Sequence, residues 1–345
     1  FPRCPRLAPG QPPCLGRGGI TGGTRRAAPG PALIVRPYRP PPWLPGGHAQ
    51  TIWPLVIKNR PPVYRRERWT TPDGDFIDVD HVTGPVTSPL VVLFHGLEGS
   101  SRSHYAIALA QAVRALGWRL ALPHFRGCSG ELNQRPRAYH SGDSTEIAWI
   151  LERLVAGNQG RPVLAVGVSL GGNALLKWAG EQGTRAVRSV QALAAVSAPL
   201  DMAACGHHLA RGFNRVYTQH FLKTLKRTAL DRLRRFPGLF DAGRMGAATT
   251  LYQFDDAVTA PLHGFSGADD YWRRASAKPW LGTIAIPALV LNARNDPFLP
   301  AQNLPTPAEV SASVRLEFPA GGGHVGFVSG TFPGHLDWLP QRLLH

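Results

Sequence analysis

The sequence predicts an α/β fold: a mostly parallel, doubly wound sheet with an inserted helical cap. Two observations predict this architecture. From residue 90 onward, short uninterrupted apolar runs that suit buried strands alternate with segments of helical periodicity. Residues 199–282 then lack strand-like alternation over a stretch that is too long for a plain crossover, which indicates a helical cap.

Composition excludes several classes of protein. The net charge of the 345-residue chain is +16, but residues 1–66 hold eleven Lys and Arg and no acidic residue, whereas the remainder holds 27 basic and 22 acidic residues. This balance is that of an ordinary enzyme surface, so we expect no nucleic-acid binding by the folded part. The four cysteines form no metal-binding pattern, and we expect reduced thiols, no metal and no cofactor.

The chain divides into an extension and a domain. Residues 1–42 are rich in Pro, Gly and Arg and have no periodic apolar face, so we expect a disordered extension followed by one domain over residues 43–345. No apolar run approaches the ~18 residues that span a membrane. We therefore expect a cytoplasmic protein without membrane insertion, and the sequence gives no indication of its oligomeric state.

The domain is predicted to begin with an arm and a hairpin. The arm, residues 43–55, holds a Gly-Gly-His turn between two tryptophans, and we interpret His48 as tying this arm to the body of the domain rather than as a site residue. Residues 67–71 and 75–82 alternate polar and apolar side chains around a Pro-Asp-Gly turn. This pattern predicts a β-hairpin at an antiparallel edge of the sheet.

The first buried strand leads into a glycine-containing turn. Residues 90–94 are all apolar and run directly into His95-Gly96-Leu97. Glycine lets the backbone of such a turn approach a ligand closely, and a loop N–H can point at a developing oxyanion. We predict that the Leu97 N–H is one oxyanion donor, and we interpret His95 as a structural turn residue.

A long polar loop follows the next two elements. The periodicity predicts a helix over residues 101–116, a strand over 118–122 and, beyond the loop, a helix over 145–155. The length and the Gly, Arg and His content of the loop, residues 123–143, predict that it lies beside the mouth of a site. We expect Arg126, His140 and Asp143 to brace the loop and Cys128 to be an unreactive free thiol.

The centre of the pattern is Gly167-Val168-Ser169-Leu170-Gly171. A buried strand is predicted over residues 163–166 and a helix from Gly171 onward, so Ser169 occupies a sharp turn between them. Flanking glycines suit the strained backbone and crowding of such a turn. This is the context of a nucleophile elbow, in which Ser169 is the nucleophile and the Leu170 N–H is the second oxyanion donor.

After a strand over residues 190–196, the cap is predicted to contain an amphipathic helix. One face of this helix carries Leu222, Leu225, Ala229, Leu233 and Phe236. The rest carries the basic residues Lys223, Lys226, Arg227, Arg232, Arg234 and Arg235. We expect the apolar stripe to pack on the domain and the basic face to be solvated; the alternative is peripheral membrane contact through this helix.

Two further strands lead to the remaining candidates. Asp296 follows the strand predicted over residues 286–291, at the carboxyl end where parallel sheets place working residues. The other acids nearby, Asp255, Asp256, Asp269 and Asp270, are predicted to fall in the cap. His324 follows the strand over residues 314–318 through a glycine run that suits a flexible loop. The order Ser169, Asp296, His324 differs from the orders of the two common serine-protease classes.

These segments together resemble a known family. The motifs are GGHAQTIWP, HGLEGSS, HFRGCSG with YHSGD, GVSLGGN, DDAVTAPLHGF, NARNDP and GGGHVGF. From about residue 42 to the end, the chain resembles the YheT-like α/β-hydrolases, also called AB hydrolase family 4. The resemblance implies an α/β-hydrolase fold, a carboxylesterase or lipase type of activity, and a catalytic triad at Ser169, Asp296 and His324.

The expected function is therefore that of a serine hydrolase acting on a small-molecule ester. It would cleave short- to medium-chain acyl esters through the Ser-His-Asp triad and an acyl-enzyme, with the Leu97 and Leu170 N–H groups binding the oxyanion. Two alternatives stay open: an acyltransferase that makes esters from acyl donors and alcohols, and a non-catalytic binding protein on the same scaffold.

Overall fold

The computed structural model describes residues 36–345. Most of the predicted extension, residues 1–42, lies outside the described residues. Within its described part, Tyr38 is buried and packs edge-on against Phe327 and Trp338, with ring centroids 5.1 and 4.9 Å apart. Packing against the domain therefore includes Tyr38, ahead of the predicted boundary at residue 43.

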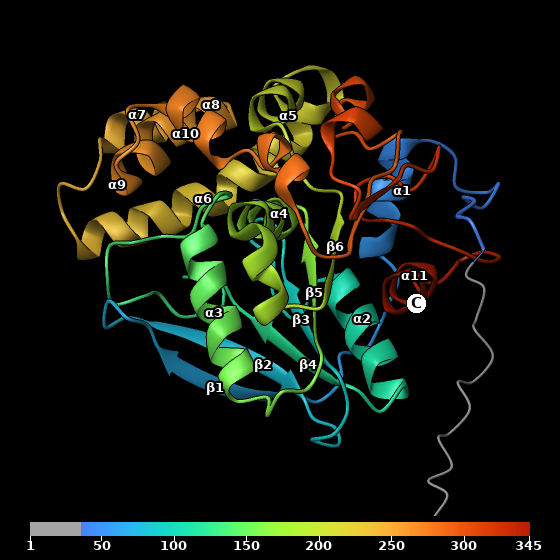
Figure 1. The fold of residues 1–345 in the computed structure, drawn as a ribbon. Helices are drawn as coiled ribbons and strands as arrows, with labels where there is room; N and C mark the ends of the chain where they lie inside the picture. The colour runs from blue at the N-terminus through green and yellow to red at the C-terminus, as the bar shows by residue number, and fades with distance from the viewer. Residues whose placement is uncertain (1–35) are drawn as a thin grey trace, which may run out of the picture. The chain divides into compact units, whose positions relative to one another are not determined.

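The centre of the domain is an eight-stranded sheet in the order β1-β2-β4-β3-β5-β6-β7-β8 (Figure 1). Its strands are β1 (Arg65–Thr70), β2 (Phe76–Val82), β3 (Leu90–Phe94), β4 (Arg119–Pro123), β5 (Val163–Val168), β6 (Ala192–Val196), β7 (Ala288–Leu291) and β8 (Val314–Glu317). Strands β1, β2 and β4 pair antiparallel, and the pairings from β4 through β8 are parallel. The predicted mostly parallel sheet with an antiparallel edge hairpin is confirmed.

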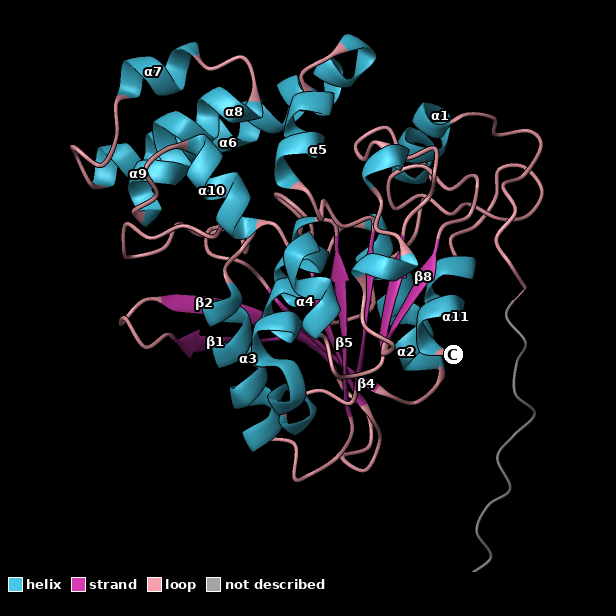
Figure 2. Ribbon diagram, turned by 45° about the horizontal axis from the view of Figure 1, so that its top comes forward, coloured by secondary structure: helices cyan, strands magenta, loops and turns pink. Residues whose placement is uncertain are grey.

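Helices cover both faces of this sheet (Figure 2). Outside the cap, the α-helices are α1 (Gly47–Ile52), α2 (His104–Ala115), α3 (Ser144–Ala156), α4 (Leu170–Gln182) and α11 (Trp338–Leu344). Short helical turns outside the cap are η1 (Trp53–Leu55), η2 (Gly183–Arg188), η6 (Ala301–Asn303) and η7 (Pro307–Glu309). Side chains of α3 and α4 join one hydrophobic cluster, and those of α2 and α11 join another, so the sheet is doubly wound.

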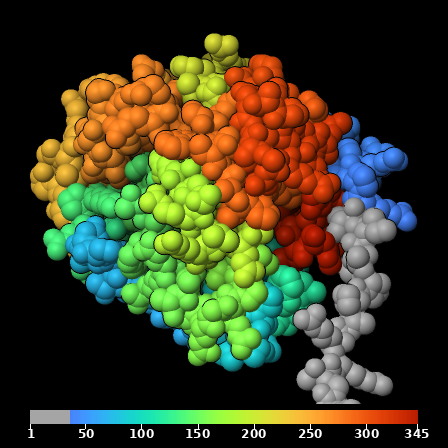
Figure 3. Space-filling model, in the orientation of Figure 1, coloured from blue at the N-terminus to red at the C-terminus, as the bar shows by residue number. Residues whose placement is uncertain are grey.

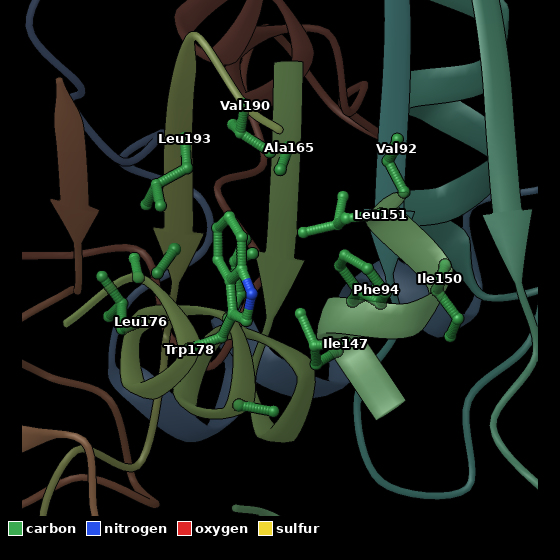
Figure 4. Close-up of a cluster of buried hydrophobic side chains, with 14 of the residues drawn as sticks. Val92, Phe94, Ile147, Ile150, Leu151, Ala165, Leu176, Trp178, Val190 and Leu193 are labelled. Atoms are coloured by element: carbon green, nitrogen blue, oxygen red, sulfur yellow. The ribbon is translucent and has the colours of Figure 1, made fainter. Parts of the chain in front are cut away.

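Strand β3 shows why the central strands are uninterrupted apolar runs. Val92 and Phe94 belong to the cluster under α3 and α4, which also contains Trp178 (Figure 4). Val91 and Leu93 point the other way, into the cluster under α2 and α11. Because successive side chains of a strand face opposite sides, a strand covered on both faces needs apolar residues throughout.

All secondary-structure elements between β6 and β7 are helices or helical turns. This segment contains α5 (Met202–Leu209), η3 (Gly212–Asn214), α6 (Arg215–Arg235), α7 (Ala242–Ala247), α8 (Leu251–Phe254), the π-helical turn η4 (Asp255–Thr259), α9 (Ala260–His263), α10 (Ala268–Ala275) and η5 (Lys278–Thr283). We refer to residues 199–282 as the cap segment. It has its own small core, which includes Leu222, Ala229 and Phe254. The space-filling view in Figure 3 shows this segment, yellow to orange, along the upper side of the domain.

Helix α6 differs from the expected solvated basic face at one position. Leu222 and Ala229 are buried, as predicted for the apolar stripe, but Arg232 is buried as well. Arg232 lies three residues after Ala229 and ten after Leu222, which places it on the same helical face. None of the helices in residues 36–345 combines the length and the apolar character that a membrane crossing requires.

Candidate active site

Ser169 occupies the turn between β5 and α4. Its backbone has φ 51° and ψ −120°, a conformation that residues other than glycine rarely adopt. The neighbouring glycines are required by space: a Cβ at Gly167 would lie 2.6 Å from the Gly171 carbonyl oxygen, and one at Gly171 would lie 2.5 Å from that of Phe94. The Ser169 N–H donates to the Val196 carbonyl at 2.8 Å, so β6 supports the turn.

The side chains of Asp296, His324 and Ser169 form a chain of hydrogen bonds with His324 in the middle. His324 Nδ1 is 2.9 Å from Asp296 Oδ2, and His324 Nε2 is 3.1 Å from Ser169 Oγ. Asp296 is buried, and its Oδ1 accepts a 2.8 Å hydrogen bond from the Phe298 N–H. A carboxylate only accepts hydrogen bonds, so His324 Nδ1 carries the proton and Nε2 is left to accept the one from the serine hydroxyl. This arrangement can remove a proton from Ser169.

Helix α1 is bonded to the loops that carry Asp296 and His324. Thr51 Oγ1 accepts from the His324 N–H at 2.9 Å, and Gln50 Oε1 accepts from the Gly322 N–H at 2.7 Å. Gln50 Oε1 also accepts from Asn295 Nδ2 at 3.0 Å. The N-terminal arm therefore positions both loops.

Gln50, Thr51 and Asn295 are residues that sequence reasoning missed. The available signal was a Gln-Thr pair within an apolar, tryptophan-rich arm: polar side chains in such a segment need partners if they are buried. The pattern along the arm does not identify those partners, because Gln50 and Asn295 are far apart in sequence. Gln50 is only 2 % exposed.

Residues 89–331, which include Ser169, Asp296 and His324, match the family model described as the alpha/beta hydrolase fold. The match spans more than half of the chain. The chain belongs to the α/β-hydrolase fold family.

The hydrolase is similar to several known proteins. It is 38% identical over 304 residues to "Putative esterase YheT" of Escherichia coli K12, covering 86% of this chain and 88% of that relative. It is 30% identical over 320 residues to mouse "Phospholipase ABHD3", covering 90% of this chain and 77% of the relative. The predicted resemblance to YheT-like hydrolases is confirmed. Among solved structures, a bacterial membrane phospholipase A has a TM-score of 0.52 at 18% identity, covering 81% of this chain and 86% of that one, and shows the fold alone.

Both predicted oxyanion donors lie beside the serine of the hydrolase. Leu97, Leu170 and Ser169 line the same pocket. The N–H groups on either side of Leu97 are occupied, since Gly96 donates to Tyr105 Oη and Glu98 to Tyr139 Oη. Neither Leu97 nor Leu170 donates its N–H to another residue in the described part of the chain. Their roles in catalysis stay predictions.

His95 has a structural environment. Its side chain is fully buried, Nε2 accepts from the Phe125 N–H at 3.0 Å, and Nδ1 lies 2.8 Å from the Gly96 carbonyl oxygen. Burial lowers the pKa of His95 to about 3, so the ring is neutral. The ring therefore joins the turn after β3 to the end of β4, consistent with the interpretation as a turn residue.

Three pockets of the hydrolase meet near Ser169. The first, which we call the apolar pocket, reaches under the cap segment and is lined by Ser169 and His324 together with mainly apolar side chains: Met202, Leu209, Phe221, Leu251, Trp272, Phe298 and Leu299. The second, the arm cleft, is lined by Ile52 and Leu55 of the arm, by Ile57 just after it, and also by Ser169 and His324. The third lies under α6 and shares Leu97, Leu170, Met202, Leu251 and Asp255 with the apolar pocket; we call it the polar pocket because Glu98, Arg232 and His263 line it beside many apolar side chains.

One acid that was predicted to fall in the cap also lines a pocket wall. Asp255 borders both the apolar and the polar pocket. Its two oxygens accept hydrogen bonds from Thr259 Oγ1 at 2.7 Å and from Trp272 Nε1 at 2.8 Å. Burial raises the pKa of Asp255 to about 6. It lies in the π-helical turn η4, a feature often found at functional sites.

His48 ties the arm to the cap segment rather than to the body of the domain. Its Nδ1 is 3.0 Å from Tyr217 Oη, and its ring stacks on Tyr217 with centroids 5.8 Å apart. Tyr217 belongs to α6. The expected tie therefore exists, but its partner differs, because the sequence pattern of the arm carries no information on the course of the cap segment.

Arg126, His140 and Asp143 brace the loop over residues 123–143 through side chains that each have a different partner, and the Asp143 N–H donates to the His140 carbonyl at 3.2 Å. Arg126 pairs with Glu146 at 2.7 Å, whereas Asp143 pairs with Arg137 at 2.8 Å. The ring of His140 packs edge-on against the ring of His263, with centroids 4.6 Å apart. Arg126 thus connects the loop to α3 and His140 connects it to the cap segment, whereas Asp143 pairs within the loop. Burial raises the pKa of the Cys128 thiol, which disfavours the reactive thiolate.

Proposed function

We propose that the hydrolase cleaves carboxylic esters with short- to medium-chain acyl groups through an acyl-enzyme on Ser169. The observation that carries the proposal is the chain of hydrogen bonds from Asp296 through His324 to Ser169. A mainly apolar pocket beside the serine supports an acyl chain as the bound group. The printed names of the relatives, an esterase and a phospholipase, support the same class of bond.

In the proposed reaction, Ser169 Oγ attacks the acyl carbonyl while His324 Nε2 takes the hydroxyl proton. Asp296 holds the imidazole in the required tautomer and stabilises the imidazolium that forms. The N–H groups of Leu97 and Leu170 donate to the oxyanion. His324 then gives its proton to the leaving alcohol, and a water molecule activated by His324 releases the acid from Ser169.

Replacing the nucleophile tests the proposal. We expect Ser169→Ala to lower the turnover of p-nitrophenyl butyrate by about three powers of ten or more, because no acyl-enzyme can form. The melting temperature should change little, since only one hydroxyl is removed. The measurements are initial rates and labelling with a fluorophosphonate probe, which requires an activated serine.

Ser88→Ala is the matched control. The Ser88 hydroxyl donates to the Pro85 carbonyl in a surface turn, away from the site, so this variant should keep both the rate and the label. Full p-nitrophenyl butyrate turnover by Ser169→Ala would contradict the assignment. Absence of both labelling and turnover in the wild-type protein would instead favour a non-catalytic role.

A further inference from the structure

Arg232 is a buried cation without a partner. The residue is 4 % exposed, and its Nε and Nη2 atoms are buried with no hydrogen-bond partner among the described residues. No ion pair of the described residues includes it. A buried unpaired charge is costly, because its desolvation is not offset by a counter-charge or by hydrogen bonds. Such a group needs an explanation.

Two other arginines of the domain have the ion pairs or the solvent exposure that Arg232 lacks. Arg126 is equally buried but pairs with three carboxylates, those of Asp73, Asp75 and Glu146. Arg234, two residues after Arg232 on α6, has a side chain that is 77 % exposed and pairs with Asp231. Arg232 is neither paired nor solvated.

Arg232 lies in the wall of the polar pocket. Gly127 lines the same pocket, and a Cβ at Gly127 would lie 3.8 Å from Arg232 Nη2. The same pocket is lined by Leu97 and Leu170, the residues beside Ser169. A group bound at Arg232 could therefore belong to a molecule whose ester lies at the serine.

The acids that line the polar pocket, Glu98 and Asp255, form no ion pair with Arg232. A second lining residue, His263, has a buried Nε2 without a partner among the described residues. Glu98 Oε1 accepts a 2.8 Å hydrogen bond from Tyr139 Oη, and burial raises the pKa of its carboxyl group. The guanidinium remains charged at neutral pH. An anion is the partner that a buried guanidinium without an ion pair lacks.

We propose that Arg232 binds an anionic oxygen group, a carboxylate or a phosphate, carried by the ester substrate of the hydrolase. The planar guanidinium can donate two parallel hydrogen bonds to either group. This inference rests on the proposed function and adds to it that the substrate extends from Ser169 into the polar pocket and ends there in a negative charge.

The test compares three esters that share the same acyl group and the same leaving-group length and that end in a methyl, a carboxylate or a phosphate group. We expect wild-type kcat/KM to be higher for one of the anionic esters than for the methyl ester. In Arg232→Met this anionic-to-neutral ratio should fall about tenfold or more, the usual effect of losing a charged hydrogen bond. The anionic ester with the larger ratio identifies the group.

Control variants separate this role from a structural one. Arg234→Met, on the exposed face of the same helix, should leave the ratio unchanged. Arg232→Lys, which keeps the charge but not the fork of donors, should retain part of it. Because Arg232→Met removes a buried unpaired charge, its melting temperature should equal or exceed that of the wild type, whereas a structural role predicts a lower one.

Two outcomes would overturn the inference while leaving the proposed function intact. One is hydrolysis of all three esters with equal kcat/KM in the wild-type protein. The other is inhibition by inorganic phosphate without any preference for the anionic esters, which would assign the pocket to a free anion. If no ester is cleaved at all, the proposed function fails, and protection against thermal unfolding by inorganic phosphate, present in the wild type and absent in Arg232→Met, decides whether Arg232 is an anion site.

Discussion

At the scale of single residues, Asp255 sets a dependence of stability on pH. Its folded-state pKa, about 6, lies above the ordinary value of 3.8. Between these values the folded chain binds more protons at this site than the unfolded chain, so the free energy of unfolding falls as the pH rises through this window. Below pH 3.8 the carboxyl is protonated in both states, and its stabilising contribution is fully present. Above about pH 6 this contribution is lost.

Asp255→Asn tests this statement. The amide does not titrate, so the stability of the variant relative to the wild type should increase by roughly 2.5 kcal/mol between pH 4 and pH 7, at about 1.4 kcal/mol per pKa unit. Urea unfolding of both proteins at several pH values measures it. The loss of one hydrogen bond adds an offset that does not depend on pH. A difference between the two proteins that stays constant with pH would contradict the prediction.

The sequence predicts site residues where a local pattern exists and misses them where the environment comes from distant segments. Ser169 is found from its flanking glycines, and Asp296 and His324 from their positions after strands. The pattern along the helix predicts a solvated face for Arg232, because a basic residue on an amphipathic helix is usually exposed. Its pocket is built by loop residues such as Tyr139 and by other parts of the cap segment, which no pattern along α6 reveals.

At the scale of elements, the turn between β5 and α4 depends on close packing. We expect Gly167→Ala to lower the free energy of unfolding by about 2 kcal/mol or more, because the added Cβ would lie 2.6 Å from backbone atoms of α4 that cannot move independently. It should also lower esterase activity, since any shift of α4 displaces Ser169. Chemical denaturation and initial rates measure the two effects.

Gly246→Ala is the control for this substitution. Gly246 lies in α7, where an added Cβ meets no atom within 4 Å. Alanine favours a helix over glycine, so stability should be unchanged or rise by up to about 1 kcal/mol. Equal losses in the two variants would show that glycine replacement as such, and not the crowding at the elbow, is responsible.

The strands were predictable because burial on both faces leaves a continuous apolar run. The strand expected over residues 190–196 is observed as Ala192–Val196, and the one over 286–291 as Ala288–Leu291. The cap segment was less predictable in detail. Its α7, α8 and α9 are four to six residues long, shorter than the windows over which helical periodicity can be recognised.

At the scale of the whole domain, the arm and the two loops of the candidate triad form one unit. We expect Gln50→Leu to lower kcat about tenfold or more with little change in KM, because Gln50 supports the loops of Asp296 and His324 but lines none of the three pockets. Stability should fall by about 1–3 kcal/mol, since the Gly322 N–H loses its buried acceptor.

The measurement is steady-state kinetics of Gln50→Leu, with Gln191→Leu as the control variant. Gln191 is exposed and its replacement should change neither constant. A variant of Gln50 with normal kcat and reduced stability would mean that α1 stabilises the domain without positioning the loops.

Because hydrogen bonds attach the arm to the domain, we expect the arm to stay bound even if the chain is cleaved after it. Between η1 and β1 the chain has no helix or strand, and Val63 is 94 % exposed there. A single proteolytic cut in this connection would leave the hydrogen bonds of Gln50 and Thr51 untouched, yet it would turn an intramolecular contact into an association of two polypeptides. The cleaved protein would then be a heterodimer whose activity falls on dilution, and a synthetic peptide of the arm could restore it.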